Sequence, residues 1–145
     1  WSIVLAKRDE YKKAFRDFDI EYCLQLSDEE LEKIRQDYNV IKNSAKIKAV
    51  RSNAAAVIQL KKEFGSFSDF LWSYVDFKPV VNSWETEGQM PAKSDLSEQI
   101  SKDLKKRGFK FVGPVIIYSF LQAIGMVDDH IKTCPQHTAN RQTVK

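Results

Sequence analysis

The sequence has few cysteines, a small net charge and no long apolar run, and each shortage excludes a class of protein. Its two cysteines, Cys23 and Cys134, cannot build a disulfide framework, so we expect a reducing, intracellular setting and a cytoplasmic protein. No apolar run approaches the roughly 20 residues that a membrane-spanning helix needs, so we expect no membrane partner. The net charge of +3 is too small to indicate a nucleic-acid partner by itself.

What the chain does contain fits one helical domain. Its 145 residues are 43% apolar and 12% aromatic, enough for a hydrophobic core and too aromatic for a disordered chain. Apolar residues recur at helical spacing, and no segment alternates convincingly as a strand does. The sequence predicts an all-α fold, a single monomeric domain over residues 1–145 with a C-terminal tail over 131–145. Because it starts at Trp1, within an apparent helix and without a methionine, we expect the domain to be N-terminally incomplete.

Individual helices can be placed from their apolar spacing and their caps. Apolar residues three and four apart predict an amphipathic helix over residues 1–18. Ser27 and Glu30 have the spacing of a capping box that opens the next helix. Residues 76–93 contain prolines and a glycine without a clear period, which predicts a long surface loop. The remaining predicted helices begin near Ser44, Ser66, Ser94 and Pro114 and stop near Gly65, Val75, Gly108 and Gly125.

A basic turn between the last two predicted helices is the first feature with a chemical meaning. Residues 96–125 have the pattern of a helix-hairpin-helix motif, in which Gly113 allows a tight turn and the close approach of a ligand. The helix that starts at Pro114 presents free amides, which favour an anionic phosphate. An ordinary helical corner with solvated lysines is the alternative. The candidate contacts to a DNA backbone are Lys105, Lys106, Lys110, Val112 and Gly113.

The same segment resembles the signature of the 3-methyladenine DNA glycosylase I family. The stretches that carry the resemblance are Arg107–Pro114, Tyr118–Ala123, Trp1 with 4–8, Phe70–Val75 and Gly125–His130, and they span nearly the whole chain. The resemblance implies a monofunctional base-excision repair enzyme, without lyase chemistry, that binds alkylated double-stranded DNA and flips out the lesion. Hydrolysis of the N-glycosidic bond then releases 3-methyladenine. Since that base is cationic in DNA, we expect an electron-rich aromatic pocket to hold it.

The resemblance also implies roles for two pocket residues. Trp1 aligns with the family's tryptophan that stacks on the flipped base, and Ser119 is expected to line the base pocket. From the residues alone, Trp1 is a core aromatic and Ser119 bonds back to the helix backbone. The family recognises its base with a glutamate and a tyrosine upstream of Trp1, so the catalytic residues of this chain are unknown.

A candidate metal site lies near the C-terminus. His130 and Cys134 are spaced i, i+4, and imidazole and thiolate both bind Zn²⁺, although from the residues alone a surface pair is the better explanation of this spacing. The resemblance implies a structural Cys-His-His-Cys zinc site between the two termini of the family, to which His130 and Cys134 would give half of the ligands. His137 is a third candidate by proximity alone, and Cys23 is expected to be a small buried residue.

Two other classes of function stay open on the sequence. One is a non-catalytic helix-hairpin-helix module that binds only the DNA backbone; an upstream glutamate, tyrosine and Cys/His pair would favour the enzyme instead. The other is a structural helical interaction domain, which predicts no salt-dependent binding of DNA.

Overall fold

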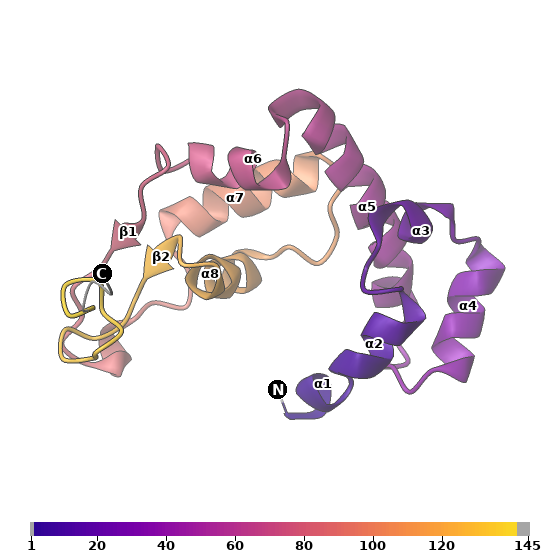
Figure 1. Cartoon of the computed structure of the whole chain (residues 1–145), viewed down its shortest axis with the longest axis horizontal. Coiled ribbons are helices and arrows are strands. Elements are labelled where there is room, and N and C mark those ends of the chain that lie inside the picture. The colour runs from indigo at the N-terminus through magenta and orange to yellow at the C-terminus, as the bar shows by residue number, and fades with distance from the viewer. Residues whose placement is uncertain (1, 142–145) are drawn as a thin grey trace. The chain divides into compact units, whose positions relative to one another are not determined.

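A computed structural model describes residues 2–141, and this part of the chain is mostly helical, in agreement with the all-α prediction (Figure 1). A single 3-10 turn spans Glu87–Gln89. The helices and strands are α1 (Ser2–Ala6), α2 (Arg8–Ala14), α3 (Ile20–Gln25), α4 (Asp28–Asp37), α5 (Ser44–Phe64), α6 (Phe67–Ser73), β1 (Val80–Val81), α7 (Asp95–Lys106), α8 (Pro114–Ala123) and β2 (Val127–Asp128). Within residues 2–141, no helix is both long enough and apolar enough to cross a membrane.

The chain divides into two compact units. The first unit comprises the chain up to Glu63 together with Lys106–Phe111, and the second comprises Phe64–Lys105 together with the chain from Val112 onward. Helices α1 to α4 and nearly all of α5 therefore belong to the first unit. The second unit holds α6, α8, both strands and most of α7.

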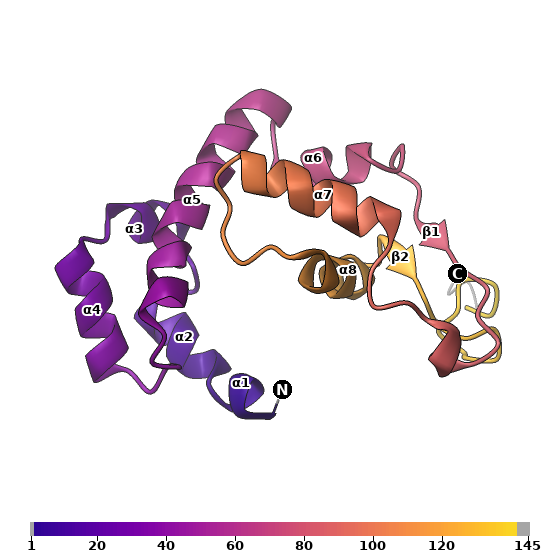
Figure 2. The same ribbon diagram turned by 180° about the vertical axis from the view of Figure 1, so that it is seen from behind.

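The first unit is built around α5. Figure 2 shows α2, α3 and α4 gathered beside this helix, and the buried side chains between them include Phe15, Leu31 and Ile47. The predicted capping box at the start of α4 is confirmed. The Ser27 hydroxyl accepts a hydrogen bond from the Glu30 amide at 3.1 Å, and the Ser27 amide donates to the Glu30 carboxylate at 2.8 Å. Two of the amides that a helix start leaves unpaired are thereby satisfied.

The prediction of one helix over residues 1–18 is wrong. The helix is interrupted between α1 and α2, and after α2 the residues Arg16, Asp17 and Phe18 have φ of 48°, 55° and 58°. A right-handed helix cannot continue through a left-handed run of this kind. Phe18 consequently leaves the apolar stripe and is 47% exposed, while its ring stacks on that of Phe15 with 5.6 Å between centroids.

Two smaller predictions also need correction. Helix α5 does start at Ser44, but the residue that caps it is Asn43, whose side-chain oxygen accepts from the Lys46 amide at 3.0 Å. The predicted loop over 76–93 contains β1, which pairs in parallel with β2 so that Val80 lies opposite Val127. Strands of two residues are too short to show an alternating pattern, which is why the sequence did not indicate them.

The connection between α7 and α8 spans residues 107–113, and we call it the hairpin. Gly108 has a φ of 91°, so it supplies the left-handed position predicted after α7. Pro114 is the first residue of α8, as predicted. The prediction that Gly113 makes the tight turn is wrong, since its φ is −64°, which any residue adopts. The second left-handed residue of the hairpin is Phe111, with a φ of 58°.

Candidate functional site

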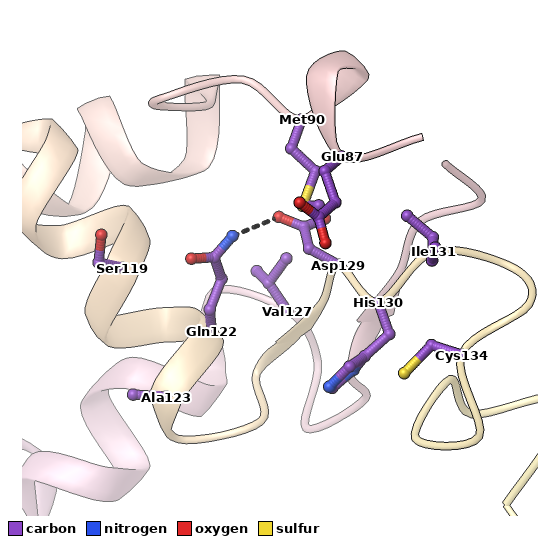
Figure 3. A pocket seen from close by; sticks show the side chains of 10 residues that line it. All are labelled: Glu87, Met90, Ser119, Gln122, Ala123, Val127, Asp129, His130, Ile131 and Cys134. Atoms are coloured by element: carbon purple, nitrogen blue, oxygen red, sulfur yellow. Dashed lines mark hydrogen bonds between the residues drawn. The ribbon is translucent and has the colours of Figure 1, made fainter. Parts of the chain in front are cut away.

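A pocket of about 710 Å³ lies in the second unit, between α8, the 3-10 turn and the segment after β2 (Figure 3). Its volume falls within the roughly 300–1,000 Å³ typical of small-molecule sites. Ser119 and Gln122 line it from α8, and Glu87 and Met90 line it from the 3-10 turn and its C-terminal cap. Among the described residues that line the pocket, Glu87 and Asp129 are carboxylates and none is lysine or arginine. The pocket is therefore suited to a cation better than to an anion.

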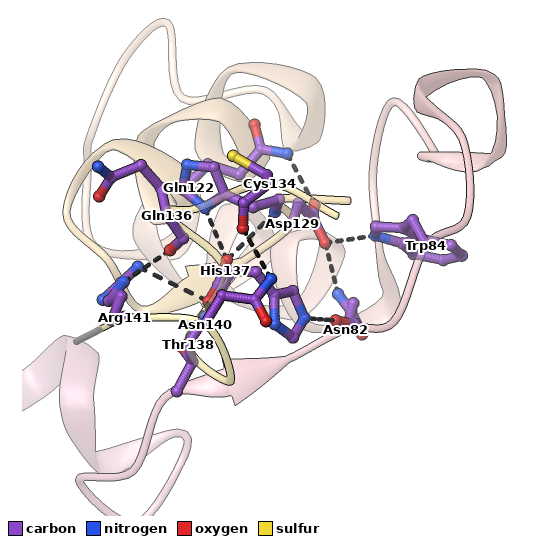
Figure 4. A network of polar contacts seen from close by, with 12 residues as sticks. Asn82, Trp84, Gln122, Asp129, Cys134, Gln136, His137, Thr138, Asn140 and Arg141 are labelled. Carbon is purple, nitrogen blue, oxygen red and sulfur yellow. Dashed lines mark hydrogen bonds and ion pairs between the residues drawn. The ribbon is translucent and has the colours of Figure 1, made fainter. Parts of the chain in front are cut away.

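Asp129 is the centre of a hydrogen-bond network in the wall of this pocket (Figure 4). One carboxylate oxygen accepts from the Asn82 amide at 2.6 Å and from the Trp84 indole at 2.7 Å. The other accepts from the Tyr118 hydroxyl and from the Gln122 amide, the latter at 2.7 Å. The side chain is only 7% exposed, so all four donors converge on a buried acceptor.

The network keeps Asp129 charged. Burial alone would raise its pKa, but the hydrogen bonds from Tyr118, Trp84, Asn82 and Gln122 outweigh burial, so the pKa lies below its usual value. Burial and the adjacent carboxylate raise the pKa of Tyr118 well above that of an ordinary tyrosine, so its hydroxyl stays protonated and donates a hydrogen bond to Asp129. At neutral pH the wall of the pocket thus carries a fixed negative charge.

The neighbouring Asp128 organises the segment after β2. It is 4% exposed, and one of its carboxylate oxygens lies 2.7 Å from Nδ1 of His130 and accepts from the His130 amide at 3.1 Å. The other oxygen accepts from the amide and hydroxyl of Thr138. Burial would raise the pKa of Asp128, but the bonds from Thr138 and His130 outweigh it and hold the pKa far below the usual range.

His130 and Cys134 line the same pocket, and the Cys134 sulfur points toward the His130 ring in Figure 3. Because Nδ1 of His130 is bonded to Asp128, Nε2 is the ring nitrogen available to a ligand. Within residues 2–141, no group of three or more histidine, cysteine, aspartate or glutamate side chains is arranged to hold a metal ion. Both residues line one pocket, but the segment over 130–134 is not helical, so the helical turn that their spacing suggested is absent there.

His137 does not fit the role of a metal ligand. Its Nδ1 accepts from the Ala139 amide at 3.2 Å, so the ring proton lies on Nε2, which is 2.9 Å from the Asn82 carbonyl oxygen. Both ring nitrogens are thus engaged in a side chain that is 5% exposed. The prediction for Cys23 is confirmed, because this cysteine is buried in the core of the first unit.

The two predicted base-binding residues have different outcomes. Ser119 lines the pocket, and its hydroxyl donates to the Val115 carbonyl oxygen one turn earlier at 3.2 Å. Its oxygen still has acceptor capacity, so the bond to the helix backbone leaves a role in base binding open as a prediction. Trp1 lies outside the described residues.

The hairpin is held by contacts on both of its sides. The Ser101 hydroxyl of α7 donates to the Val112 carbonyl oxygen at 2.6 Å. The Arg107 guanidinium pairs with Glu63 at 2.8 Å, and the Phe109 side chain is 6% exposed. Of the predicted contacts to DNA, Lys105, Lys106 and Lys110 are exposed, and Val112 and Gly113 are half-buried. A Cβ on Gly113 would meet nothing within 4 Å, so a close approach to this residue is sterically open.

Sequence reasoning missed the network around Asp129 and the place of Glu87 in the lining of the pocket. In the sequence, Asp129 stands out only as part of the stretch Gly125–His130, and its four donors come from positions up to 47 residues away. Polar residues clustered at Asn82 and Trp84, in a segment without periodicity, were the available signal. Polar side-chain atoms that become buried need a hydrogen-bond partner, but the sequence does not say where in the chain that partner lies.

Comparison with known proteins agrees with this geometry. The family model described as methyladenine glycosylase matches residues 1–137. The chain is 40% identical over 141 residues to DNA-3-methyladenine glycosylase 1 of Escherichia coli, which covers 97% of this chain and 75% of that protein. It is 39% identical over 139 residues to DNA-3-methyladenine glycosylase of Haemophilus influenzae, with 96% and 75% covered.

Solved structures give the same result. The structure of 3-methyladenine DNA glycosylase I from Staphylococcus aureus is similar, with a TM-score of 0.89 and 37% identity over 94% of this chain and 73% of that one. A variant of 3-methyladenine DNA glycosylase I in complex with 3-methyladenine has a TM-score of 0.90 and 37% identity, over 94% of this chain and 74% of its own. On sequence and fold alike, the chain belongs to the 3-methyladenine DNA glycosylase I family.

Proposed function

We propose that this chain is a DNA-3-methyladenine glycosylase of base-excision repair, which hydrolyses the N-glycosidic bond of 3-methyladenine in alkylated DNA. The observation that carries the proposal is its similarity, over 97% and 96% of the chain, to bacterial proteins named for this activity. The enzyme extrudes the alkylated base from the duplex, at a cost of a few kcal/mol that is lowest for damaged bases.

The chemistry of the pocket supports this substrate. A 3-methyladenine in DNA carries a positive charge, and the pocket offers the carboxylates of Glu87 and Asp129 and the oxygens of Ser119 and Gln122. A fixed negative charge favours the cationic base over its neutral, unmodified counterpart. Ser119 contacts the base as an acceptor, and Trp1 stacks on it, by analogy with the tryptophan of the family.

The hairpin supplies the contact to the DNA backbone. The exposed lysines Lys105, Lys106 and Lys110 neutralise phosphates, and the amides near Val112 and Gly113, at the start of α8, donate to a phosphate oxygen. These contacts hold the duplex without reading its sequence, as a repair enzyme requires.

The experiment that tests the activity uses the whole chain and duplex DNA treated with a methylating agent. Released bases are separated by chromatography, and we expect 3-methyladenine among them, with none released from the untreated duplex. An absence of released 3-methyladenine contradicts the proposal. Salt-dependent binding of the duplex without release would favour the non-catalytic helix-hairpin-helix module instead.

Zinc is the metal that His130 and Cys134 fit. The hydrogen bond that Nδ1 of His130 donates to Asp128 fixes the ring and leaves the lone pair of Nε2 for a metal, which is the usual support of a zinc-bound histidine. A structural zinc site has four ligands, so two more are needed in addition to this pair. When bound, the ion would fix the segment after β2 and with it one wall of the pocket.

Metal analysis of the purified protein tests this assignment. We expect zinc in the wild-type protein and its loss in His130→Ala and Cys134→Ala, while Cys23→Ala, which changes the other cysteine, keeps it. Wild-type protein without zinc, or zinc retained in both variants of the pair, would contradict the assignment.

A further inference from the structure

The backbone of the hairpin is fixed by a side chain from α5. The Asn53 side-chain oxygen accepts from the Lys110 amide at 2.8 Å, and its amide nitrogen donates to the Lys110 carbonyl oxygen at 3.2 Å. One side chain thus pairs with both polar backbone groups of a single residue, as a neighbouring strand would. All of these atoms belong to the first unit.

Lys110 needs such a partner because it lies in an irregular segment. It lies two residues after Gly108 and directly before Phe111, both of which have left-handed backbone conformations, so the segment cannot form a helix or a strand. Without Asn53 the two backbone groups would turn to water, and several conformations of similar energy would become accessible.

Two further contacts from α5 reach the same segment. The Lys46 ammonium lies 5.7 Å from the centre of the Phe111 ring, and Glu63 pairs with Arg107. Lys46 and Asn53 are seven residues apart, nearly two helical turns, and therefore share one face of α5. Of these three contacts, only that of Asn53 holds the main chain itself, and it holds it at the lysine assigned to a phosphate.

We propose that Asn53 is a positioning residue for DNA binding, which holds the Lys110 main chain so that the Lys110 side chain meets the DNA backbone. The inference rests on the proposed function of the hairpin and adds a residue on α5 to it. Asn53 contacts no DNA itself. Its role is to order the hairpin before DNA binds, so that less conformational entropy is lost on binding.

The test compares Asn53→Ala with Ser52→Ala in the full chain. Ser52 is the adjacent residue of α5, and its hydroxyl bonds to the Ala49 carbonyl oxygen within the helix, so its removal deletes a hydrogen bond without touching the hairpin. Binding to a fluorescent duplex with a stable abasic-site analogue is measured at several salt concentrations. We expect Asn53→Ala to raise Kd about five- to twentyfold, the effect of losing two ordinary hydrogen bonds, and Ser52→Ala to leave it unchanged.

Two further measurements separate positioning from mere stability. The release of 3-methyladenine at saturating DNA should change less than about twofold in Asn53→Ala, because the pocket is intact once DNA is bound. Hydrogen exchange at the Lys110 amide should accelerate in Asn53→Ala and stay unchanged in Ser52→Ala. If Asn53 acts through Lys110, Asn53→Ala should weaken binding less in a Lys110→Ala background than in the wild type.

Different results for these variants would contradict different parts of the proposal. If Lys110→Ala leaves the Kd unchanged, the hairpin does not contact DNA as proposed and Asn53 has nothing to position. If Lys110→Ala weakens binding but Asn53→Ala behaves as Ser52→Ala does, the positioning role alone is wrong. A lower melting temperature in Asn53→Ala with an unchanged Kd would show that Asn53 serves only the stability of the fold.

Discussion

Replacing Asp129 by alanine should destabilise the protein by about 3–5 kcal/mol. The variant removes the common acceptor of four donors, of which the Tyr118 hydroxyl belongs to a residue only 3% exposed. A buried donor left without a partner costs about 1–3 kcal/mol, and each of the half-buried donors, which regain water, loses about 0.5–1 kcal/mol. The expected loss of stability is smaller than the combined free energy of four charge-assisted hydrogen bonds, because the variant also removes the cost of burying a charge.

Thermal unfolding measures this effect. At about 2–4 °C per kcal/mol for a chain of this size, Asp129→Ala should lower the melting temperature by about 6–20 °C. Asp129→Asn keeps the shape but turns an amide toward one pair of donors, so it should cost about 2 kcal/mol or more. Asp37→Asn, an exposed aspartate at the end of α4, is the control and should stay within about 0.5 kcal/mol of wild type. If Asp129→Asn is as stable as that control, the four donors do not depend on a carboxylate and the network is wrongly described.

Three further predictions concern single local interactions. Hydrogen bonds from Arg35 and Gln36 lower the pKa of Glu32 from 4.5 to about 2. In Arg35→Ala, the midpoint of an NMR titration followed on the side-chain carboxyl carbon of Glu32 should therefore move back toward 4.5. Because the pKa of Glu32 is lower in the folded protein than in the unfolded chain, these hydrogen bonds stabilise the fold above pH 4.5. The stabilisation is lost as the pH falls toward 2, where the free energies of unfolding of wild type and Arg35→Ala should become equal. Ser27→Ala removes the capping box of α4 and should cost about 1 kcal/mol in thermal unfolding, whereas Ser68→Ala, exposed in the first turn of α6, should cost little. Lys105→Ala combined with Lys110→Ala should reduce the slope of log K against log salt for duplex binding by about 2; an unchanged slope would exclude these lysines as phosphate contacts.

Local signals in the sequence identified most helices and their ends. The capping box at Ser27, the left-handed glycine at Gly108 and the proline that opens α8 all act within a few residues, so their pattern is visible in the chain. The left-handed run at Arg16 to Phe18 has no such signal, because none of its residues is a glycine or an asparagine. The amphipathic spacing there continued past the point where the helix ends.

The candidate site was predicted only where a motif or a family stretch named its residues. Ser119, His130 and Cys134 do line one pocket. Asp129 and Asn53 were not singled out, because each acts on groups that are distant in sequence: Asn53 bonds to a residue 57 positions later. Contacts of this range form only in the tertiary fold. A buried charge is identified by the groups that hydrogen-bond to it in space, and not by the residues next to it in the sequence.

The parallel pairing of β1 with β2 has a consequence for how the protein is made and how it opens. Val80 meets Val127 only after 46 intervening residues, and Asn82 and Trp84 find their acceptor only at Asp129. On a ribosome, the pocket therefore stays unformed until the residues after α8 have emerged. In the finished protein, opening residues 80–84 or residues 127–129 breaks the same strand pairing and the same hydrogen bonds, so we expect these two segments to open together.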